Sequence, residues 1–337
     1  MPRPLMTQAV VFEAPLTVVV RDIEIPPPGP DDLVIDTIAT WISPGTEMSY
    51  LKGERIYGDT AAVEGSPHPF PRVAGYQKIG RIVDVGKNVR GFKVGQVVFN
   101  TFGRARGMFE AQAGHIKTAV SAPDDVYALP QGVDPQWFSG GVLTQVGYNC
   151  ASRVPVETGD LAVVLGDGLV GLWTAQMLQH RGAKVWLVGR HEMRLSRFNC
   201  REGDRAIRLA RGAKLEPLTA QLDEPIAVLV ETVGTLAPMI ELIPHMRHNG
   251  QLVCAAFYGG PTRDVIHVPQ IRSRELSLHT PAGLRRARMA KTFELIAQGI
   301  LQTAPLITHR LPYANAAHAF DLLMNHKDQA LGVLLLW

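Results

Sequence analysis

A glycine-rich turn in the middle of the chain is the clearest candidate for chemistry. An apolar run that predicts a strand ends at Leu165, and the sequence GDGLVG (166–171) leads directly into a helical pattern. In such a turn the first glycine permits a tight bend, the second lets the backbone approach a pyrophosphate, and the third lets the helix pack closely on the strand. The position between strand and helix predicts a dinucleotide site rather than a purely structural turn. The residues expected to contact the dinucleotide are Gly166, Gly168, Leu169, Val170 and Gly171.

The end of the next predicted strand bears on the choice between NAD(H) and NADP(H). An NAD-preferring site places an acid there to accept hydrogen bonds from ribose hydroxyls, whereas this chain has Gly189. Arg190 and Arg194, assisted by His191, would form an anion clamp around a 2′-phosphate. The alternatives are that both arginines are solvated and that Glu192 reaches a ribose hydroxyl. We predict NADP(H) in preference to NAD(H).

Two later strand ends predict the channel for the nicotinamide. Thr232, Val233 and Gly234 follow one apolar run, and Phe257 and Tyr258 follow the next. Ligands of open α/β sheets bind outside the carboxyl ends of the strands. We therefore expect these five residues to line the site.

The elements around these residues alternate between strand and helix. The runs LAVVLG, KVWLVG, IAVLVET, QLVCAAF and LSLHT predict strands, with helical patterns between them. This alternation is typical of parallel βαβ units with right-handed crossovers. One of the helices is expected over residues 236–248, ended by Asn249-Gly250.

The two ends of the chain predict a second, β-rich domain. Short valine- and isoleucine-rich runs bounded by Pro and Gly fill the first third and read as strands. The terminal LGVLLLW predicts a strand that joins them, which makes this domain discontinuous. We assign residues 1–123 and 286–337 to the β-rich domain and residues 124–285 to the parallel-sheet domain. Residues 53–71 read as a surface loop.

Length and composition exclude several classes of protein. The 337 residues suit two domains, and 34 basic against 31 acidic side chains give a net charge of +3. That balance is unlike a dedicated nucleic-acid binder. The three cysteines are too few for a disulfide framework or a Cys-based structural zinc site. No apolar run has the ~20 residues of a membrane span, and the amino terminus lacks a signal-peptide pattern, so we expect a cytoplasmic protein.

The order of these parts resembles the medium-chain dehydrogenase/reductase superfamily over essentially the whole chain. The family-like segments are WISPGTE, VAGYQKIGRIVDVGKNV, FKVGQVV, the glycine turn and LITHRLPYANAAHAFDLL. ISPGTE, AGYQ, CAAFYGGP and LITHR look most like its bacteriochlorophyllide hydroxyethyl dehydrogenase branch. The resemblance implies an α/β fold, in which a GroES-like β-rich catalytic domain and a Rossmann doubly wound parallel-sheet cofactor domain enclose the active site. It also implies a homodimer.

The chain departs from the zinc-dependent members of that family at each metal-ligand position. Those members have an early Cys, a His-Glu pair after a glycine, and a later Cys or acid. The matching positions here are Ser43 or Pro44, Tyr76-Gln77 and residues 143–145 (LTQ). None of them supplies the thiolate or imidazole that a catalytic Zn²⁺ needs. We therefore predict an enzyme without a metal ion.

Without a metal ion, hydrogen-bond donors must stabilise the charge that hydride transfer develops on a carbonyl oxygen. Tyr76 matches the lost histidine, and Ser43, Thr46 and Glu47 come from the loop that matches the lost cysteine. We predict these four as catalytic: Tyr76 or Ser43 donates to the substrate oxygen, and Glu47 orients or relays. The alternatives are turn-satisfying hydroxyls, a packed tyrosine ring, and an ion pair of Glu47 with Lys52 or an arginine.

The predicted function is a zinc-independent, NADP(H)-linked oxidoreductase that transfers hydride between the nicotinamide and an alcohol/carbonyl substrate. The alternatives are an NADPH-dependent quinone or enone (C=C) reductase and a non-catalytic NADPH-binding protein. The expected partner is a small molecule and not a nucleic acid. An anionic substrate group would explain Arg104 and Arg106, and the alternative is that both are solvated charges. An apolar pocket for a bulky substrate would instead be formed by Trp41, Phe102, Met108 and Tyr258.

Overall fold

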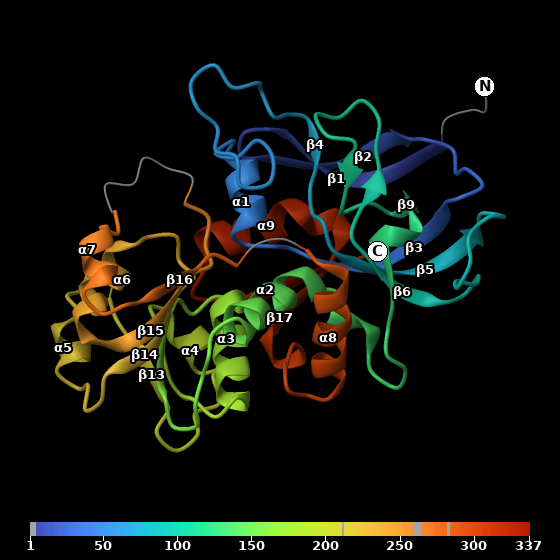
Figure 1. Ribbon diagram of the computed structural model, residues 1–337. Coiled ribbons are helices and arrows are strands. Elements are labelled where there is room, and N and C mark those ends of the chain that lie inside the picture. Colours follow the sequence, from blue (N-terminus) through green and yellow to red (C-terminus); the bar gives the residue numbers. More distant parts are fainter. Residues whose placement is uncertain (1–4, 211, 259–264, 282–283) are drawn as a thin grey trace. The chain divides into compact units, whose positions relative to one another are not determined.

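The computed structural model describes residues 5–210, 212–258, 265–281 and 284–337. It divides into two compact units (Figure 1). The first unit comprises Met1–Val142 and Ile307–Trp337, and the second comprises Leu143–Leu306.

The first unit is β-rich, and its strands form two main sheets. The larger sheet has the order β10-β6-β5-β3-β18-β17, with β9 also paired to β3, and a smaller sheet has the order β2-β1-β4. Strand β18 pairs antiparallel with β3, with Leu334 opposite Trp41, so the carboxyl-terminal strand joins the amino-terminal ones as predicted. The strands are β1 (Leu5–Ala14), β2 (Thr17–Ile25), β3 (Leu33–Trp41), β4 (Arg72–Val73), β5 (Lys78–Val85), β6 (Val97–Asn100), β7 (Gly103–Arg104), β8 (Gln112–Ala113), β9 (Thr118–Ser121), β10 (Val126–Ala128), β17 (Ile307–Pro312) and β18 (Gly332–Leu336). The helices are α1 (Thr46–Leu51) and α9 (Ala316–Asn325), with 3-10 turns at Pro123–Asp125, Pro135–Phe138 and Tyr313–Asn315.

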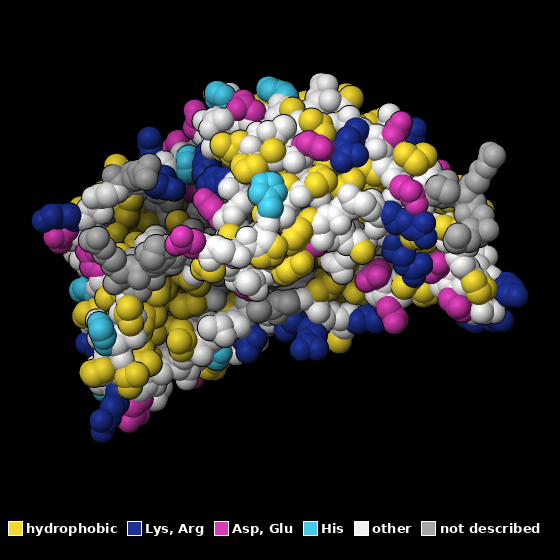
Figure 2. Space-filling view, turned by 90° about the horizontal axis from the view of Figure 1, so that it is seen from above, with side chains coloured by type: hydrophobic (Ala, Val, Ile, Leu, Met, Phe, Trp, Pro, Cys, Tyr) yellow, Lys and Arg dark blue, Asp and Glu magenta, His cyan; other side chains and the backbone are white. Residues whose placement is uncertain are grey.

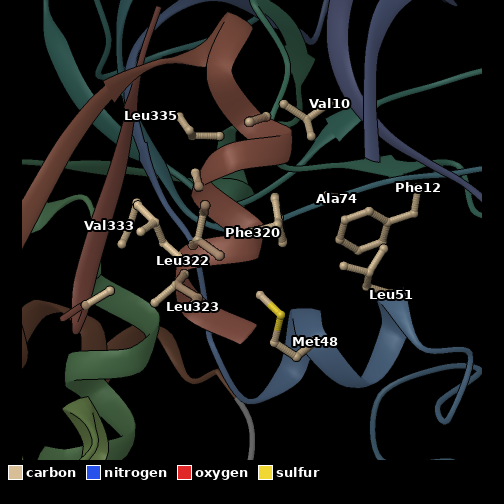
Figure 3. Packing of buried hydrophobic residues seen from close by; sticks show 14 of the residues in the cluster. Val10, Phe12, Met48, Leu51, Ala74, Phe320, Leu322, Leu323, Val333 and Leu335 are labelled. Carbon is tan, nitrogen blue, oxygen red and sulfur yellow. The ribbon is translucent and has the colours of Figure 1, made fainter. Parts of the chain in front are cut away.

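A hydrophobic core joins α1 and α9 to the strands of this unit. Phe320 of α9 meets Phe12 of β1 edge to face, with ring centroids 5.1 Å apart. Met48 and Leu51 of α1 belong to the same cluster (Figure 3). Burying side chains of this size contributes about 1.5–3 kcal/mol each. The core thereby fixes the short helix that carries Glu47.

The second unit is a parallel sheet with the strand order β13-β12-β11-β14-β15-β16. This is the doubly wound Rossmann order, and the direction of winding reverses between β11 and β14, where such folds bind ligands. The predicted fold class is therefore confirmed. The strands are β11 (Leu161–Leu165), β12 (Lys184–Gly189), β13 (Arg205–Arg208), β14 (Ile226–Glu231), β15 (Met246–Cys254) and β16 (Ser277–His279). The helices are α2 (Gly141–Ser152), α3 (Leu169–His180), α4 (Glu192–Leu195), α5 (Glu216–Thr219), α6 (Ala237–Leu242), α7 (Val268–Arg272) and α8 (Arg286–Ala297), with 3-10 turns at Ile243–His245 and Ala304–Leu306.

One predicted helix is shorter than expected. Helix α6 ends at Leu242, and β15 already begins at Met246. Asn249 has φ 58° and lies inside β15, at an irregularity in the pairing of this strand with β14. The Asn-Gly pair therefore marks a left-handed residue within a strand and does not end a helix.

The boundaries of the two units differ from those predicted for the domains. Residues 124–142 belong to the first unit, where β10 pairs with β6. Residues 286–306 belong to the second unit. There the Gln302 N–H donates to Gln176 Oε1 (2.9 Å) and the Gln302 carbonyl accepts from Trp173 Nε1 (3.3 Å), which ties this segment to α3.

Charged side chains are mixed on the visible surface. On the face drawn in Figure 2, basic and acidic side chains of the described residues are interspersed. This matches the balanced composition and is unlike the basic stripe of a nucleic-acid binder. Among the described helices, none has the length and apolar character needed to cross a bilayer.

Candidate functional site

The glycine turn leaves space where a pyrophosphate would have to approach. Gly166 has φ +120°, and a Cβ there would lie 2.2 Å from Thr232 Oγ1. A Cβ on Gly171 would lie 2.0 Å from the Gly166 carbonyl oxygen. A Cβ on Gly168 would meet no atom within 4 Å. The first and third glycines are therefore needed for packing, and the second faces open space.

The helix that follows presents its amino terminus at this open space. Gly168 is the N-cap of α3 and provides no side-chain cap. A helix leaves its first N–H groups without intrahelical partners, so Leu169 and Val170 lie where such groups, with the positive end of the helix dipole, can bind an anion. Thr232 donates its hydroxyl to the Leu165 carbonyl oxygen (2.9 Å) and so closes the turn from the side of β14.

Asp167, between the first two glycines, is a functional residue that sequence reasoning missed. Its Oδ2 accepts hydrogen bonds from the backbone N–H groups of Arg190 and His191, both at 2.7 Å, and lies 3.0 Å from His191 Nδ1. Burial alone would raise the pKa of Asp167, but the hydrogen bonds from His191 and Arg190 lower it below its ordinary value. A Cβ on Gly189 would lie 2.4 Å from Asp167 Cβ, so the missing side chain at residue 189 is what admits this carboxylate. The sequence did contain a pattern from which Asp167 could have been predicted: an acid inside the glycine motif, together with a glycine at the end of the next strand.

The predicted anion clamp is brought together only in part. His191 faces Asp167, and Arg194 is buried with its guanidinium 3.8 Å from the same carboxylate. Among the described residues, none forms a hydrogen bond or an ion pair with the exposed Arg190 side chain. Of the three predicted clamp residues, His191 and Arg194 therefore face Asp167, and the Arg190 side chain does not.

The two loops expected at the nicotinamide are held together by a second missed acid, Glu231. The backbone N–H groups of Val233 and Gly234 donate to Glu231 Oε1, the latter at 2.8 Å, and the Tyr258 hydroxyl donates to Oε2. Burial raises the pKa of Glu231. Phe257 precedes Tyr258 in the second loop, and the GGP of CAAFYGGP lies outside the described residues. Glu231 thus fixes both loops at the carboxyl ends of β14 and β15.

In the first unit, the predicted catalytic residues gather around α1. The Tyr76 hydroxyl donates to Ser43 Oγ (2.7 Å), and the Ser43 N–H donates to Glu47 Oε1 (2.7 Å). Thr46 is the first residue of the same helix. Glu47 Oε2 lies 2.9 Å from Nε2 of His115, and neither residue is more than 1% exposed. His115 was missed because no motif links it to the loop 68 positions earlier.

Within the described part of the chain, Glu47 does not form the suggested ion pair with a lysine or an arginine. Lys52 instead lies 3.6 Å from Glu54.

Burial is the main reason why the pKa of Tyr76 is raised above its ordinary value, and the hydrogen bond to Ser43 only partly opposes this. Tyr76 therefore presents a neutral hydroxyl.

A cavity of about 190 Å³ lies beside this network. Tyr76, Thr46 and Glu47 contribute to its wall, and Phe102 adds an apolar surface. Pockets for drug-sized ligands commonly measure about 300–1,000 Å³. The cavity thus suits a small molecule or one end of a larger one.

Most of the residues considered for binding an anionic or apolar substrate form other contacts or lie outside this cavity. Arg104 pairs with Asp32 and Arg106 with Glu24, both at 2.8 Å. Of the four expected apolar wall residues, Trp41 is fully buried, Met108 packs against another cluster, and Tyr258 belongs to the second unit. Only Phe102 lines the cavity.

The positions compared with zinc ligands do not fit a catalytic zinc ion. Gln77 is used structurally, since its Nε2 donates to the Trp41 carbonyl oxygen (3.3 Å) and its Oε1 accepts from the Val142 N–H (3.1 Å). Within the described ranges, no group of three or more His, Cys, Asp or Glu side chains is placed to hold a metal ion. Glu47 and His115 supply two such side chains, and a tetrahedral catalytic site takes three.

The known proteins to which the chain is similar are dehydrogenases. No family model matches it. It is 27% identical to 2-desacetyl-2-hydroxyethyl bacteriochlorophyllide A dehydrogenase of Rhodobacter capsulatus, over 98% of both chains. It is also 25% identical to L-threonine 3-dehydrogenase of Pseudoalteromonas atlantica, over 94% of this chain and 96% of that protein.

Two solved structures share the fold of this chain. One is an alcohol dehydrogenase from Escherichia coli complexed with NADH, with a TM-score of 0.82, 19% identity, and coverage of 98% of this chain and 99% of that one. The other is a putative zinc-binding dehydrogenase from Sinorhizobium meliloti bound to NADP, with a TM-score of 0.80, 19% identity, and coverage of 99% of this chain and all of that one (100%). In fold and in sequence the chain is thus similar to dehydrogenases of the medium-chain dehydrogenase/reductase superfamily.

Proposed function

We propose that this protein is a zinc-independent, NADP(H)-linked oxidoreductase that interconverts an alcohol and a carbonyl compound. The observation that carries the proposal is the hydrogen bond between Tyr76 and Ser43 beside a cavity. In zinc-dependent members the matching positions hold the metal. A donor hydroxyl backed by a second hydroxyl can stabilise a developing oxyanion in place of a cation.

The second unit would bind the cofactor. Gly168 and the amino terminus of α3 would receive the pyrophosphate, because space is open at that glycine. Arg190 would pair with the 2′-phosphate, since Gly189 provides no competing carboxylate and Asp167 is already occupied by His191. When bound, NADPH supplies a hydride to the carbonyl carbon.

The first unit would supply the proton. Tyr76 donates its hydroxyl hydrogen to the carbonyl oxygen, which becomes more basic as the hydride arrives. Because an alkoxide is a stronger base than a phenolate, the proton moves to the substrate even though burial raises the pKa of Tyr76. The Ser43 hydroxyl can rotate to donate to the phenolate oxygen, and Glu47 keeps Ser43 in place through the backbone N–H.

Turnover with a panel of ketones, secondary alcohols, quinones and enones tests the proposal. We expect carbonyl reduction by NADPH, less than one zinc ion per chain, and activity that survives chelation. Loss of the alkene with the carbonyl intact would favour the C=C reductase. Tight NADPH binding without turnover would favour a binding protein, and a rate that depends on zinc would overturn the metal-free assignment.

A homodimer is part of the proposal. β16 is an edge strand of the parallel sheet, and its Leu278 is 46% exposed. Edge strands of this kind present unpaired backbone groups to another chain. The mass in solution, compared between the wild type and Leu278→Lys, tests this.

A further inference from the structure

The cavity beside Tyr76 has a second set of polar side chains that the proposed chemistry does not use. Arg72 of β4, Glu110 in the segment before β8, and Gln112 of β8 all line it. Their hydrogen-bonding capacity decides what a substrate must carry besides the reacting carbonyl.

Arg72 is held rigidly. Its side chain is 3% exposed, one guanidinium nitrogen donates to the Ile56 carbonyl oxygen (3.1 Å), and another bonds Glu110 Oε2. The guanidinium also lies 3.8 Å from the ring centroid of Tyr50, a cation–π contact. A buried ion pair of this kind is often no more stabilising than apolar packing. Stability alone therefore does not account for it.

Glu110 retains an acceptor for a ligand. Only its Oε2 bonds Arg72, and among the described residues none bonds Oε1. The Gln112 amide likewise has no hydrogen-bond partner within the described part of the chain. The cavity wall thus offers one free carboxylate oxygen and one free amide.

The charges of the wall disfavour an anionic group and do not require a cationic one. Its charged side chains are one cation, Arg72, and two acids, Glu110 and Glu47. An anionic substrate group would meet an excess of acid. A cationic group is not required to balance Glu110, because the Arg72 guanidinium already neutralises that carboxylate. A neutral hydroxyl satisfies both partners, because it can donate to the carboxylate and accept from the amide.

Building on the proposed function, we infer that Glu110, fixed by Arg72, is a substrate-specificity site for a second, uncharged hydroxyl. The substrate class is then a hydroxyketone or the corresponding diol, and not a simple ketone, a keto acid or an aminoketone. Glu110 and Gln112 touch the substrate, and Arg72 is a positioning residue.

The test compares hydroxyketones, with the hydroxyl one to three carbons from the carbonyl, against ketones of equal length without it. For at least one spacing, we expect kcat/KM to favour the hydroxyketone by about tenfold to a hundredfold, the range for one hydrogen bond to a charged group. The ratio falls to about one in Glu110→Ala and partly in Glu110→Gln. An unchanged ratio in Glu110→Ala, or a preference for the keto acid or aminoketone, overturns the inference. Thermal unfolding shows whether each variant is folded.

Calorimetric binding of the same pairs to the full chain separates this inference from the proposed function. If binding favours the hydroxyketone and Glu110→Ala abolishes that preference, the subsite stands even where no compound is turned over, and only the proposed reaction fails. If turnover occurs but neither binding nor kcat/KM distinguishes the pair, the subsite is wrong and the oxidoreductase stands.

Discussion

Replacing Tyr76 by phenylalanine tests the proposed chemistry most directly. The change removes one hydroxyl and keeps the ring. It leaves Ser43 Oγ without the partner that now lies at 2.7 Å. The loss of one such hydrogen bond costs about 1 kcal/mol of unfolding free energy. The variant should therefore fold, and its free energy of unfolding should change only by about that amount.

The effect on turnover should be much larger than the effect on stability. Removing one donor to a developing oxyanion costs about 2.7–4 kcal/mol, or about 10²–10³ in kcat. Because burial raises the pKa of Tyr76, the wild-type hydroxyl remains protonated through the alkaline range in which a free tyrosine would titrate. We expect no loss of activity near pH 10 that is due to this residue, in contrast to an enzyme that uses an exposed tyrosine.

Stopped-flow oxidation of NADPH, together with urea unfolding, measures both effects. Tyr127→Phe is a matched control, since Tyr127 is 8% exposed, belongs to β10 of the same unit, and packs 5.9 Å from the Phe99 ring without lining the cavity. If Tyr76→Phe retains at least a third of the wild-type kcat, or if both variants lose activity equally, Tyr76 does not donate to the substrate.

Three further predictions concern the cofactor and the buried charge. Arg190→Ala should weaken NADPH binding roughly tenfold to a hundredfold, as for a lost charged hydrogen bond, with little change for NADH in fluorescence titration; equal losses for both contradict the clamp. Gly171→Ala should destabilise the fold by several kcal/mol, because its Cβ would lie 2.0 Å from a carbonyl oxygen. Gly168→Ala should keep the urea midpoint and weaken cofactor binding, and a similar loss of stability in both variants would show that the turn is misassigned. Burial lowers the pKa of Lys78 to about 7 from an ordinary 10.5. Between these two pH values the unfolded state holds more protons than the folded state. The free energy of unfolding should therefore rise with pH in this range by up to about 1.4 kcal/mol per pH unit. Lys78→Met should abolish that slope.

Local pattern was sufficient to predict the second unit but not all of its boundaries. Apolar runs and the glycine turn predicted five of the strands and the cofactor helix α3. β13 was missed because its sequence, RAIR, carries two arginines and is short. The Asn249-Gly250 pair misled because a left-handed residue occurs both after helices and at strand irregularities. Only the pairing with β14 distinguishes the two.

The candidate site was predictable where a motif identifies its own residues. Two of the three buried acids that bind loop backbone, Asp167 and Glu231, were missed, whereas Glu47 was predicted. Asp167 accepts the N–H groups of Arg190 and His191, Glu231 accepts those of Val233 and Gly234, and Glu47 accepts that of Ser43. A backbone N–H belongs to every non-proline residue, so the sequence gives no sign of which one an acid will bind. In each case the carboxylate fixes the backbone of a predicted functional loop. A site that relies on hydroxyls needs this support more than a metal site does, because a metal ion draws its ligands into place, whereas a hydroxyl must already be held at the position where charge will develop.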